Sequence, residues 1–456
     1  MSLNIVILAA GQGKRMHSNL PKVLHYLGGK TLLEHVVDAV ASIEKDKIYI
    51  VYSDDVVPEK LSHLSVTWVK QEKPLGTAHA VHQVLPKLDE NSHLLVLCGD
   101  VPLITESTVQ RLIDRTADDA VGCLTAMVKY PSGFGRVIRG ARGQLQSIVE
   151  ERDATDRQRK IREVNAGTYI VPVRYLKQWL PSLKAHNAQN EYYFTDIIAS
   201  AIEDQVTVQT TYAGSVMEIQ GINDHDQLSR LERYWQRENA RGYMQAGLAL
   251  KDPERFDVRG TFEFGRDTTI DINVIIEGVV KVGANCLIGS NVILRHATLG
   301  DHVEVKPNSI IEEATIANHC TIGPFARVRP GTQLDENVRI GNFVELKKAE
   351  IQAGSKINHL SYIGDAMIGK DVNIGAGTIT CNYDGVNKHR TVIGDNAFIG
   401  SDSQFIAPVT VGANATIGAG STITQDAPAG KLTVARSKQV TIEDWQRPEK
   451  EKEKVR

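Results

Sequence analysis

The 456-residue chain has few of the features that mark secreted, membrane-bound or nucleic-acid-binding proteins. Its five cysteines are an odd number and form no CxxC pair, which predicts reduced thiols and a cytoplasmic location. No apolar run is long enough to span a membrane, and the opening MSLNIVILAAG lacks a basic segment, which indicates a buried strand rather than a signal peptide. The net charge of -3 supports neither a nucleic-acid surface nor a polybasic membrane patch.

Three zones of different composition follow one another along a chain that is too long for one compact domain. In residues 1–226, apolar runs alternate with helical patterns, which predicts an α/β, Rossmann-like domain with a largely parallel sheet. Residues 227–250 are rich in charge, with leucines at helical spacing, and predict a long connecting helix. Residues 251–456 carry a six-residue repeat and end in a charged tail, 449–456, which we expect to be solvated and disordered.

The first zone predicts a ligand site at one edge of its sheet. Strands are expected at 4–8, 48–51, 66–69 and 94–98, and helices at 31–43 and 77–85. Because sheets of this class bind ligands at the carboxyl ends of their strands, the segments after the first and fourth of these strands are candidates.

The third zone repeats with a period of about six residues. Isoleucine, valine, leucine or phenylalanine recurs at every fifth or sixth position from 270 to 423, often followed by glycine, with one interruption at 380–391. This period predicts a parallel β-helix of about eight coils, in which the aliphatic residue points inward and glycine permits the corner. The repeat resembles the left-handed β-helix of the hexapeptide acyltransferases, and that resemblance implies both the handedness and assembly as a homotrimer.

The segment LAAGQGKRM (8–16), directly after the first strand, is a candidate phosphate loop. Gly11 and Gly13 free the backbone to approach a phosphate, Arg15 supplies a bidentate cation, and Lys22 in LPKVL supplies a point charge. The loop lacks the third glycine of a dinucleotide fingerprint and has no P-loop GK[ST]. An ordinary tight turn is the alternative interpretation.

This loop begins a series of motifs that resembles the sugar-nucleotide pyrophosphorylases. The motifs occur in the family's order: LAAGQGKRM, LPKVL, LGTAHA (75–80), CGDVPL (98–103), GFGRV (133–137), EVNAG (163–167) and GIND (221–224). Relatives commonly have threonine where this chain has Lys14, and can have tyrosine where it has Cys98, so no side-chain role is carried over to those two positions.

The resemblance implies which residues hold the nucleotide sugar. For the uridine nucleotide and its phosphates they are Leu8, Ala9, Gly11, Gly13, Lys22, Gln71, Gly76, Thr77, Cys98, Gly99 and Asp100. For the N-acetylglucosamine end they are Gly135, Glu150 and Asn165, with Tyr193 and Thr195 as neighbours. Asp100 is paired with Asn223 as a ligand of Mg²⁺, a hard cation that prefers oxygen donors, although Asp100 could instead cap the helix after Pro102.

The implied reaction is governed by charge. A sugar 1-phosphate attacks the α-phosphorus of UTP while both molecules are anionic, and Mg²⁺, Arg15 and Lys22 offset that repulsion and the charge on the departing pyrophosphate. The sugar phosphate is itself the nucleophile, so the protein has to position the reactants rather than supply one.

His359 stands in the repeat segment KINHLSYIGDAMIG, two positions after the inward Ile357, so its ring should point out of the β-helix. Since coils repeat about every 17 or 18 residues, several cations, a tyrosine and two amides could converge near it from nearby coils. They are Arg329, Lys347, Tyr362, Asn373, Asn382 and Lys388. Such a group suits a phosphate-bearing substrate, whereas the alternative is a solvated surface histidine.

The repeat zone contains the further strings RVRPG (327–331), NFVELKKA (342–349), NHLSYIGD (358–365), NIGAGTITCNYDG (373–385) and FIGSD (398–402). Together with the motifs of the first zone, they resemble the bacterial bifunctional family that joins an N-acetylglucosamine-1-phosphate uridylyltransferase to a glucosamine-1-phosphate acetyltransferase. The product of that family feeds cell-envelope polymers. The resemblance implies that His359 is the general base, with Glu345 orienting it. It implies that glucosamine 1-phosphate is held by Arg329, Lys347, Tyr362, Asn373 and Lys388. It implies that acetyl-CoA is held by Asn382, Tyr383, Ser401, Ala419 and Arg436, although Tyr383 could instead fill the core.

Two alternatives remain open at this point. In the first, the chain is a nucleotidyltransferase with one activity and a regulatory β-helix, and His359→Ala affects nothing. In the second, the β-helix is a trimerising scaffold that binds neither CoA nor sugar phosphate. The cations around His359 and the interruption at 380–391 argue against both.

Overall fold

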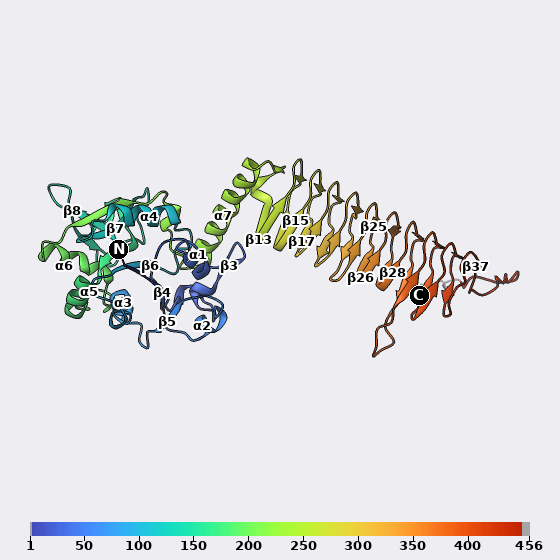
Figure 1. Ribbon diagram of the computed structural model, residues 1–456, viewed down its shortest axis with the longest axis horizontal. Helices are drawn as coiled ribbons and strands as arrows, with labels where there is room; N and C mark the ends of the chain where they lie inside the picture. The colour runs from blue at the N-terminus through green and yellow to red at the C-terminus, as the bar shows by residue number, and fades with distance from the viewer. Residues whose placement is uncertain (1, 449–456) are drawn as a thin grey trace, which may run out of the picture. The chain divides into compact units, whose positions relative to one another are not determined.

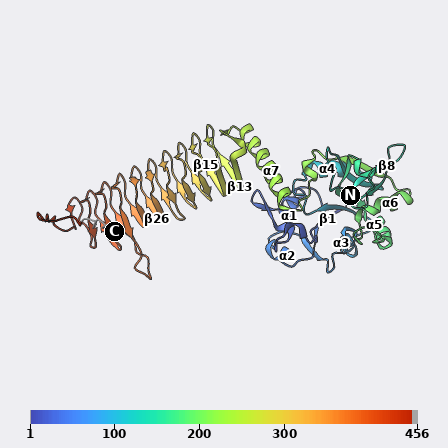
Figure 2. The same ribbon diagram turned by 180° about the vertical axis from the view of Figure 1, so that it is seen from behind.

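The computed structural model describes residues 2–448 and divides the chain into two compact units, Met1–Arg237 and Glu238–Arg456. The charged tail predicted at 449–456 lies outside the described residues. Figures 1 and 2 give front and back views of the two units. Within the described part of the chain, no helix is both long and apolar enough to cross a membrane.

The first unit is built on one mixed sheet, in which the described strands follow the order β11-β7-β10-β6-β1-β4-β5. The strands that position the site are β1 (Leu3–Leu8), β4 (Lys47–Tyr52), β5 (Thr67–Lys70), β6 (His93–Cys98) and β10 (Glu163–Pro172). The rest of this path consists of β7 (Val121–Met127) and β11 (Val208–Tyr212), with β8 (Arg136–Arg139) and β9 (Leu145–Val149) attached to β10. Strands β1, β4, β5 and β6 run parallel, as predicted, while β10 is antiparallel to β6.

The chain order creates a switch point between β1 and β6. From β1 the chain moves outward through β4 and β5, and then returns to place β6 on the other side of β1. The loops after these two strands therefore diverge at the carboxyl edge of the sheet, which is where open α/β sheets form ligand crevices.

Helices complete the first unit. They are α1 (Leu32–Asp38), α2 (Val56–Lys60), α3 (Thr77–His82), α4 (Glu106–Arg115), α5 (Val173–Trp179) and α6 (Ile197–Glu203). Helices α1 and α3 are shorter than the sequence predicts because their last turns tighten. After α1, Val40 N–H donates to the carbonyl of Val37 three residues back, and after α3, Gln83 N–H donates in the same way to Ala80.

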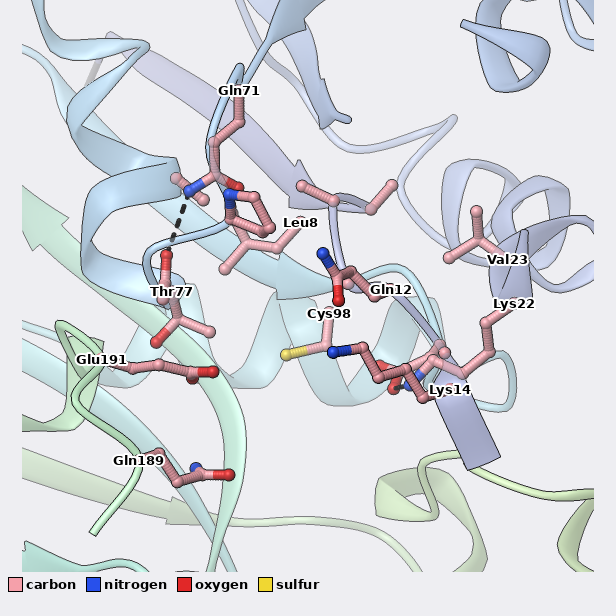
Figure 3. Close-up of a pocket in the computed structure, with 18 of the residues that line it drawn as sticks. Leu8, Gln12, Lys14, Lys22, Val23, Gln71, Thr77, Cys98, Gln189 and Glu191 are labelled. Atoms are coloured by element: carbon pink, nitrogen blue, oxygen red, sulfur yellow. Dashed lines mark hydrogen bonds and ion pairs between the residues drawn. The ribbon is translucent and has the colours of Figure 1, made fainter. Parts of the chain in front are cut away.

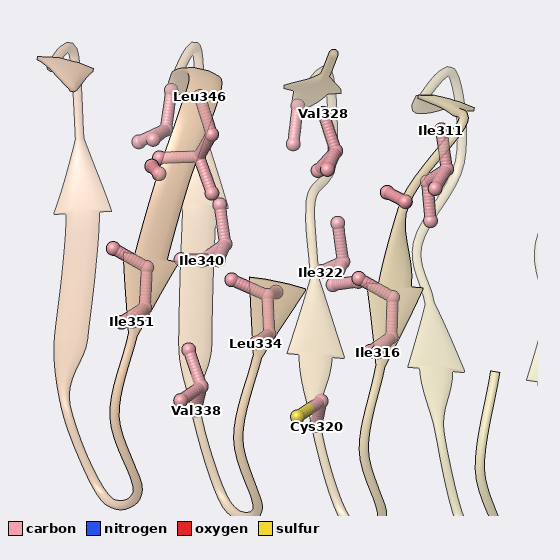
Figure 4. Close-up of a cluster of buried hydrophobic side chains, with 14 of the residues drawn as sticks. Ile311, Ile316, Cys320, Ile322, Val328, Leu334, Val338, Ile340, Leu346 and Ile351 are labelled. Carbon is pink, nitrogen blue, oxygen red and sulfur yellow. The ribbon is translucent and has the colours of Figure 1, made fainter. Parts of the chain in front are cut away.

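The second unit is a left-handed β-helix of hexapeptide repeats, and Figure 1 shows its strands stacked in successive coils. Every aliphatic or phenylalanine position that the repeat predicts is buried, and Figure 4 shows these side chains filling the interior. One face has 11 strands among the described residues, more than the eight coils predicted, because the stack extends from β12 (Ala249–Leu250) to β37 (Leu432–Thr433). The corner residues include asparagines with positive φ, such as Asn285 and Asn291, which tolerate that conformation well.

The coils around His359 have the predicted register. Their strands are β23 (Arg327–Val328), β25 (Arg339–Asn342), β26 (Glu345–Ile351), β27 (Lys356–His359), β28 (Tyr362–Ile368), β29 (Asn373–Ile374), β30 (Ile379–Cys381) and β31 (Thr391–Ile393). Ile340, Ile357 and Ile374 lie opposite one another on three successive coils.

The predicted interruption is a projecting hairpin between β30 and β31, visible in Figure 1 below β28. Tyr383 and Lys388 pair as an antiparallel bridge, and Asp384 accepts hydrogen bonds from the backbone N–H groups of Val386 and Asn387. The loop is shorter than the predicted 380–391 at both ends, because Thr380 and Cys381 belong to β30 and Thr391 begins β31. Thr380 takes an inward position of the repeat, where its buried hydroxyl accepts from Gly364 N–H at 2.7 Å.

Helix α7 (His225–Gln245) begins two residues earlier and ends five residues earlier than the predicted connecting helix. Its first half packs on the first unit, where Leu231 is buried and Glu232 accepts a hydrogen bond from Gly28 N–H at 2.7 Å. Its last turns contribute Ala240 and Tyr243 to the core of the second unit.

Candidate active sites

A cavity of about 660 Å³ opens at the carboxyl ends of β1, β5 and β6. Most residues predicted for the nucleotide line it: Leu8, Ala9, Gly11, Gly13, Lys22, Gln71, Gly76, Thr77, Cys98 and Asp100. Figure 3 shows Gln71 and Thr77 on one side of this cavity and Lys14 and Lys22 on the other. The cavity therefore has an amide and hydroxyl end and a cationic end, as a nucleoside phosphate requires.

Two glycines of the cavity wall are required by close contacts. Gly13 has φ 56°, and a Cβ there would lie 2.8 Å from the Cβ of Lys22. Gly76 has φ 116°, and a Cβ there would lie 2.5 Å from the carbonyl oxygen of Tyr192. Any side chain at these positions would push Lys22 or the segment around Tyr192 away from the cavity.

Lys22 brings together the two residues predicted to hold the metal. Its ammonium forms an ion pair with Asp100 and donates to Asn223 Oδ1 at 3.2 Å. The carboxylate of Asp100 and the amide oxygen of Asn223 therefore converge on one point. This is a hard-oxygen donor set that fits Mg²⁺, with substrate phosphates and water completing the coordination. The capping alternative for Asp100 is wrong, because Thr105 caps the helix that follows, α4.

The residues predicted for the sugar end lie beside the cavity rather than in its lining. Asn165 N–H donates to the carbonyl of Gly135 at 2.9 Å, and the hydroxyl of Thr195 donates to Glu150 at 3.4 Å. Burial raises the pKa of the Glu150 carboxyl, and this effect outweighs the opposing hydrogen bond from Thr195. Tyr193 is also buried, and its hydroxyl accepts from Gln189 at 2.8 Å.

Cys98 lies between the two ends of this site. Burial raises the pKa of its thiol to about 12, with the Asp100 carboxylate adding to the effect. The thiol donates to the carbonyl of Gly167 at 3.6 Å. A thiol with this pKa stays neutral at physiological pH, so Cys98 contributes shape to the site and not a nucleophile.

The residues that line the nucleotide cavity differ in part from those that the sequence predicts. Arg15 is exposed and does not line the cavity, and Gly99 lies behind it, where its N–H donates to Leu8 O at 2.9 Å. The sequence interpretation missed several lining side chains: Gln12, Lys14, Pro74, Arg152, Gln189 and Glu191. Lys14 had a signal, since it lies in the glycine loop, whereas Arg152, Gln189 and Glu191 come from distant loops without a recognisable motif.

In the second unit, the exposed ring of His359 lies at the end of β27. Its Nδ1 lies 3.0 Å from Asn342 Oδ1 on the preceding coil. Because an amide oxygen only accepts hydrogen bonds, Nδ1 carries a proton, and in the neutral ring Nε2 then keeps its lone pair. The residue predicted to orient this ring, Glu345, instead accepts from Arg329 at 2.6 Å, so Asn342 is the partner of His359.

Three of the predicted cations gather on the neighbouring face. The Lys388 ammonium lies beside that of Lys347 and holds the pKa of Lys347 below its usual value, with a smaller contribution from Arg329. Lys388 comes from the projecting hairpin, so the hairpin reaches Lys347 within the same chain. Although Glu345 pairs with Arg329, two ammonium groups this close together are typical of an anion-binding site.

The predicted asparagines and tyrosines of this site lie on different faces of the β-helix. Tyr362 and Asn382 approach each other over Gly364, where a Cβ would lie 2.4 Å from the Tyr362 hydroxyl and 2.9 Å from Asn382 Nδ2. Asn373 lies on the other side of the corner, paired with Lys356 in the sheet that contains β27. Tyr383 is 61% exposed, so the alternative that it fills the core is wrong.

Three of the residues predicted for acetyl-CoA, Ser401, Ala419 and Arg436, follow the same edge of the β-helix as His359. Backbone hydrogen bonds link the corners of successive coils, from Gly377 N–H to His359 O and from Gly420 N–H to Ser401 O. At the end of this series the Arg436 guanidinium donates to Ala419 O at 2.7 Å. His359 and Arg436 are thus four coils apart, about 19 Å along the edge.

Comparisons with known proteins agree with this division of the chain. Residues 5–199 match the MobA-like NTP transferase domain, residues 313–348 and 390–425 match the bacterial transferase hexapeptide, and residues 279–312 match the hexapeptide repeat of succinyl-transferase. The protein named Bifunctional protein GlmU from Methylococcus capsulatus is 51% identical over 99% of this chain and 98% of its own length. Those from Marinobacter nauticus (50%, covering 98% and 99%) and Francisella tularensis subsp. novicida (51%, covering 100% of both) are similarly close.

The fold and the two sites define a nucleotidyltransferase unit followed by a hexapeptide-repeat transferase unit. With about half of its residues identical over nearly the full length of such relatives, the chain belongs to the GlmU family of bifunctional proteins. That membership disfavours both alternatives in which the β-helix has no activity.

Proposed function

We propose that this chain makes UDP-N-acetylglucosamine with two separate sites, one in each unit. The second unit acetylates glucosamine 1-phosphate with acetyl-CoA, and the first unit transfers a uridylyl group from UTP to the N-acetylglucosamine 1-phosphate formed, releasing pyrophosphate. The domain boundaries that we propose are 1–226 for uridylyl transfer and 251–456 for acetyl transfer, joined by 227–250.

In the first unit, the cavity of β1, β5 and β6 holds UTP. Gln71, Gly76 and Thr77 face the uridine, while the glycine loop and Lys22 face the phosphates. Asp100 and Asn223 would hold Mg²⁺, which when bound supplies positive charge to the phosphates. Glu150 and Asn165 position the sugar so that its phosphate oxygen attacks the α-phosphorus as the bond to pyrophosphate breaks.

In the second unit, His359 is the general base. Its Nε2 takes a proton from the amine of glucosamine 1-phosphate. The amine nitrogen meanwhile attacks the thioester carbonyl of acetyl-CoA, and the thiolate of CoA departs. Arg329, Lys347 and Lys388 bind the sugar phosphate together with Tyr362 and Asn373. The edge through Ser401 and Ala419 to Arg436 holds the extended body of acetyl-CoA, with Asn382 and Tyr383 near its acyl end.

The β-helix assembles as a homotrimer in this proposal. Phe325, Phe343 and Leu360 stand at one corner of successive coils and are 50%, 55% and 63% exposed. An apolar ridge of this kind is typical of a contact surface. Leu360 directly follows His359, so a subunit covering the ridge also lies beside the base. We also propose that the enzyme acts in the cytoplasm on small molecules.

The observation that carries the proposal is the presence of both sites on one chain: a nucleotide cavity with a metal-compatible pair, and a histidine with a free Nε2 near clustered cations. The test is an assay with glucosamine 1-phosphate, acetyl-CoA, UTP and Mg²⁺, each omitted in turn. Omitting acetyl-CoA should abolish release of free CoA and of UDP-N-acetylglucosamine. Omitting UTP or Mg²⁺ should abolish formation of UDP-N-acetylglucosamine, while free CoA is still released. Nucleotide-sugar formation that never requires acetyl-CoA would contradict the proposal.

A further inference from the structure

The side chain of Gln71 is held by two acceptors at the edge of the nucleotide cavity. Gln71 follows β5 and is 2% exposed. Its Nε2 lies 3.3 Å from the carbonyl oxygen of Gly76, marked in Figure 3, and 2.7 Å from Nδ1 of His79. A carbonyl oxygen only accepts, so the end of the amide facing Gly76 is the NH₂ group.

Each ring nitrogen of His79 lies near an amide nitrogen: Nδ1 lies 2.7 Å from Gln71 Nε2, and Nε2 lies 3.3 Å from Gln83 Nε2. A neutral ring can accept at only one of these nitrogens, and the shorter contact assigns that role to Nδ1. Since the NH₂ group of Gln71 donates, the Nδ1 atom of His79 has to accept, and the proton of the neutral ring is therefore on Nε2. Burial, together with the neighbouring His82, lowers the pKa of His79, which keeps the ring neutral at physiological pH. The amide nitrogen of Gln83 donates to the carbonyl of His79 at 3.1 Å, so its longer contact with Nε2 of the ring is not needed to satisfy it.

With its NH₂ group occupied, Gln71 presents only an acceptor, Oε1, to the cavity. The uracil ring carries a donor, N3–H, on its pairing edge, whereas cytosine has an unprotonated acceptor at the same atom. Uracil can therefore form a hydrogen bond with Oε1, while cytosine would place two acceptors against each other in a buried setting.

We infer that His79 is a positioning residue that sets the nucleotide specificity of uridylyl transfer, because it holds the Gln71 amide with its oxygen towards the base and thereby selects UTP over CTP. This inference rests on the proposed uridylyl transfer in the first unit. His79 does not contact the substrate in this account. Without its Nδ1 acceptor, the Gln71 amide keeps only the longer bond to Gly76 and can rotate to offer NH₂ to cytosine.

The experiment compares kcat/KM for UTP and CTP, with N-acetylglucosamine 1-phosphate and Mg²⁺, in the full-length protein. His79→Phe and His79→Leu both remove the acceptor, whereas His79→Asn places an amide oxygen near the position of Nδ1. We expect the UTP:CTP ratio to fall roughly 10- to 100-fold in the first two variants and to be largely retained in the third. His82→Leu, an exposed histidine of the same helix, should keep the wild-type ratio and is the matched control.

Combining His79→Phe with Gln71→Ala tests whether His79 acts on nucleotide specificity through Gln71. In Gln71→Ala the UTP:CTP ratio should already be low, and adding His79→Phe should not lower it further. Acetyl transfer measured on the same samples reports that the protein is intact. An unchanged ratio in active His79→Phe or His79→Leu protein, or additive losses in the double variant, would overturn the inference. Wild-type protein that transfers no uridylyl group would instead contradict the proposed function itself.

Discussion

Lys22 occupies an unusual place among the residues of the first site, because one ammonium contacts both proposed metal ligands, Asp100 and Asn223. The Lys22 side chain is only 11% exposed, and the carboxylate it neutralises is 22% exposed. The charge of Lys22 therefore has two opposing effects. It attracts the phosphates of UTP, and it repels the cation that the same oxygens would bind.

Lys22→Met should separate these two effects. We expect kcat for uridylyl transfer to fall about 100-fold, because a charge that stabilises the reacting phosphates is lost. The Mg²⁺ concentration giving half-maximal rate should decrease, since Asp100 and Asn223 no longer contact an ammonium. A titration of rate against Mg²⁺ in both proteins measures this, with acetyl transfer as the control. A half-maximal concentration that increases would contradict this reading of the site.

Lys388→Gln tests the cation group of the second site through its pH dependence. The Lys388 ammonium lowers the pKa of Lys347, so its removal should raise that pKa and keep Lys347 charged to higher pH. At neutral pH, KM for glucosamine 1-phosphate should increase about tenfold because one phosphate contact is lost. The rise of KM on the alkaline side should begin at higher pH than in the wild type. Lys370→Gln, an exposed lysine after β28, should change neither property.

At the scale of elements, β27 connects the buried interior of the β-helix to the edge that carries His359. Ile357 is fully buried between Ile340 and Ile374, and His359 lies two residues further along the same strand. Stacked side chains of this kind fix the register of each coil, and the register in turn places His359 opposite Asn342.

Ile357→Ala should therefore affect stability and one activity together. The cavity left in the interior should cost about 2–4 kcal/mol of unfolding free energy. Acetyl transfer should weaken, because His359 loses its fixed position, while uridylyl transfer remains. Calorimetry and the two assays measure these effects. Leu287→Ala, at a position 53% exposed on β16 (Leu287–Ile288), should change stability by less than about 0.5 kcal/mol. Equal losses in the two variants would contradict the account.

The sequence predicted these elements well wherever a local period determines them. The six-residue period located the buried positions of the β-helix and the outward His359, and the strands β1, β4, β5 and β6 are where apolar runs predict them. The six-residue period did not predict Thr380 as an inward strand position, because the residue there is a threonine and not an aliphatic one. Its hydroxyl is satisfied by hydrogen bonds with the backbone of Gly364.

Contacts between distant residues were harder to predict. Asn342 is 17 residues from His359, and its contact with the ring depends on which residues pair between successive coils. Similarly, Gln189 and Glu191 reach the nucleotide cavity because the segment around Tyr192 bonds to Leu75 and Ala78, which no local pattern in the sequence indicates. The assignments of individual site residues stay predictions until they are tested.

At the scale of the whole molecule, helix α7 belongs to both units. Leu231 and Trp235 pack with the first unit, where a Cβ on Gly28 would lie 2.3 Å from the Trp235 ring, whereas Ala240 lies in the core of the second. A cut at the predicted boundary, residue 226, would therefore remove part of the hydrophobic core of the first unit.

Two fragments test this division. Fragment 1–237 should fold and transfer uridylyl groups, whereas fragment 1–226 should be less stable by roughly 3–5 kcal/mol, because it loses the packing of Leu231 and Trp235. Urea denaturation of both fragments measures the difference. Indistinguishable unfolding midpoints would show that α7 does not contribute to the first unit.

The central claim is that the two reactions occur at separate sites, and the most direct test measures both of them in His359→Ala and in Asp100→Ala. We expect His359→Ala to lower acetyl transfer by about 10²–10⁴ while uridylyl transfer stays within about twofold of wild type. Asp100→Ala should do the reverse. If either substitution silenced both reactions in folded protein, or if His359→Ala left acetyl transfer intact, the account would be contradicted.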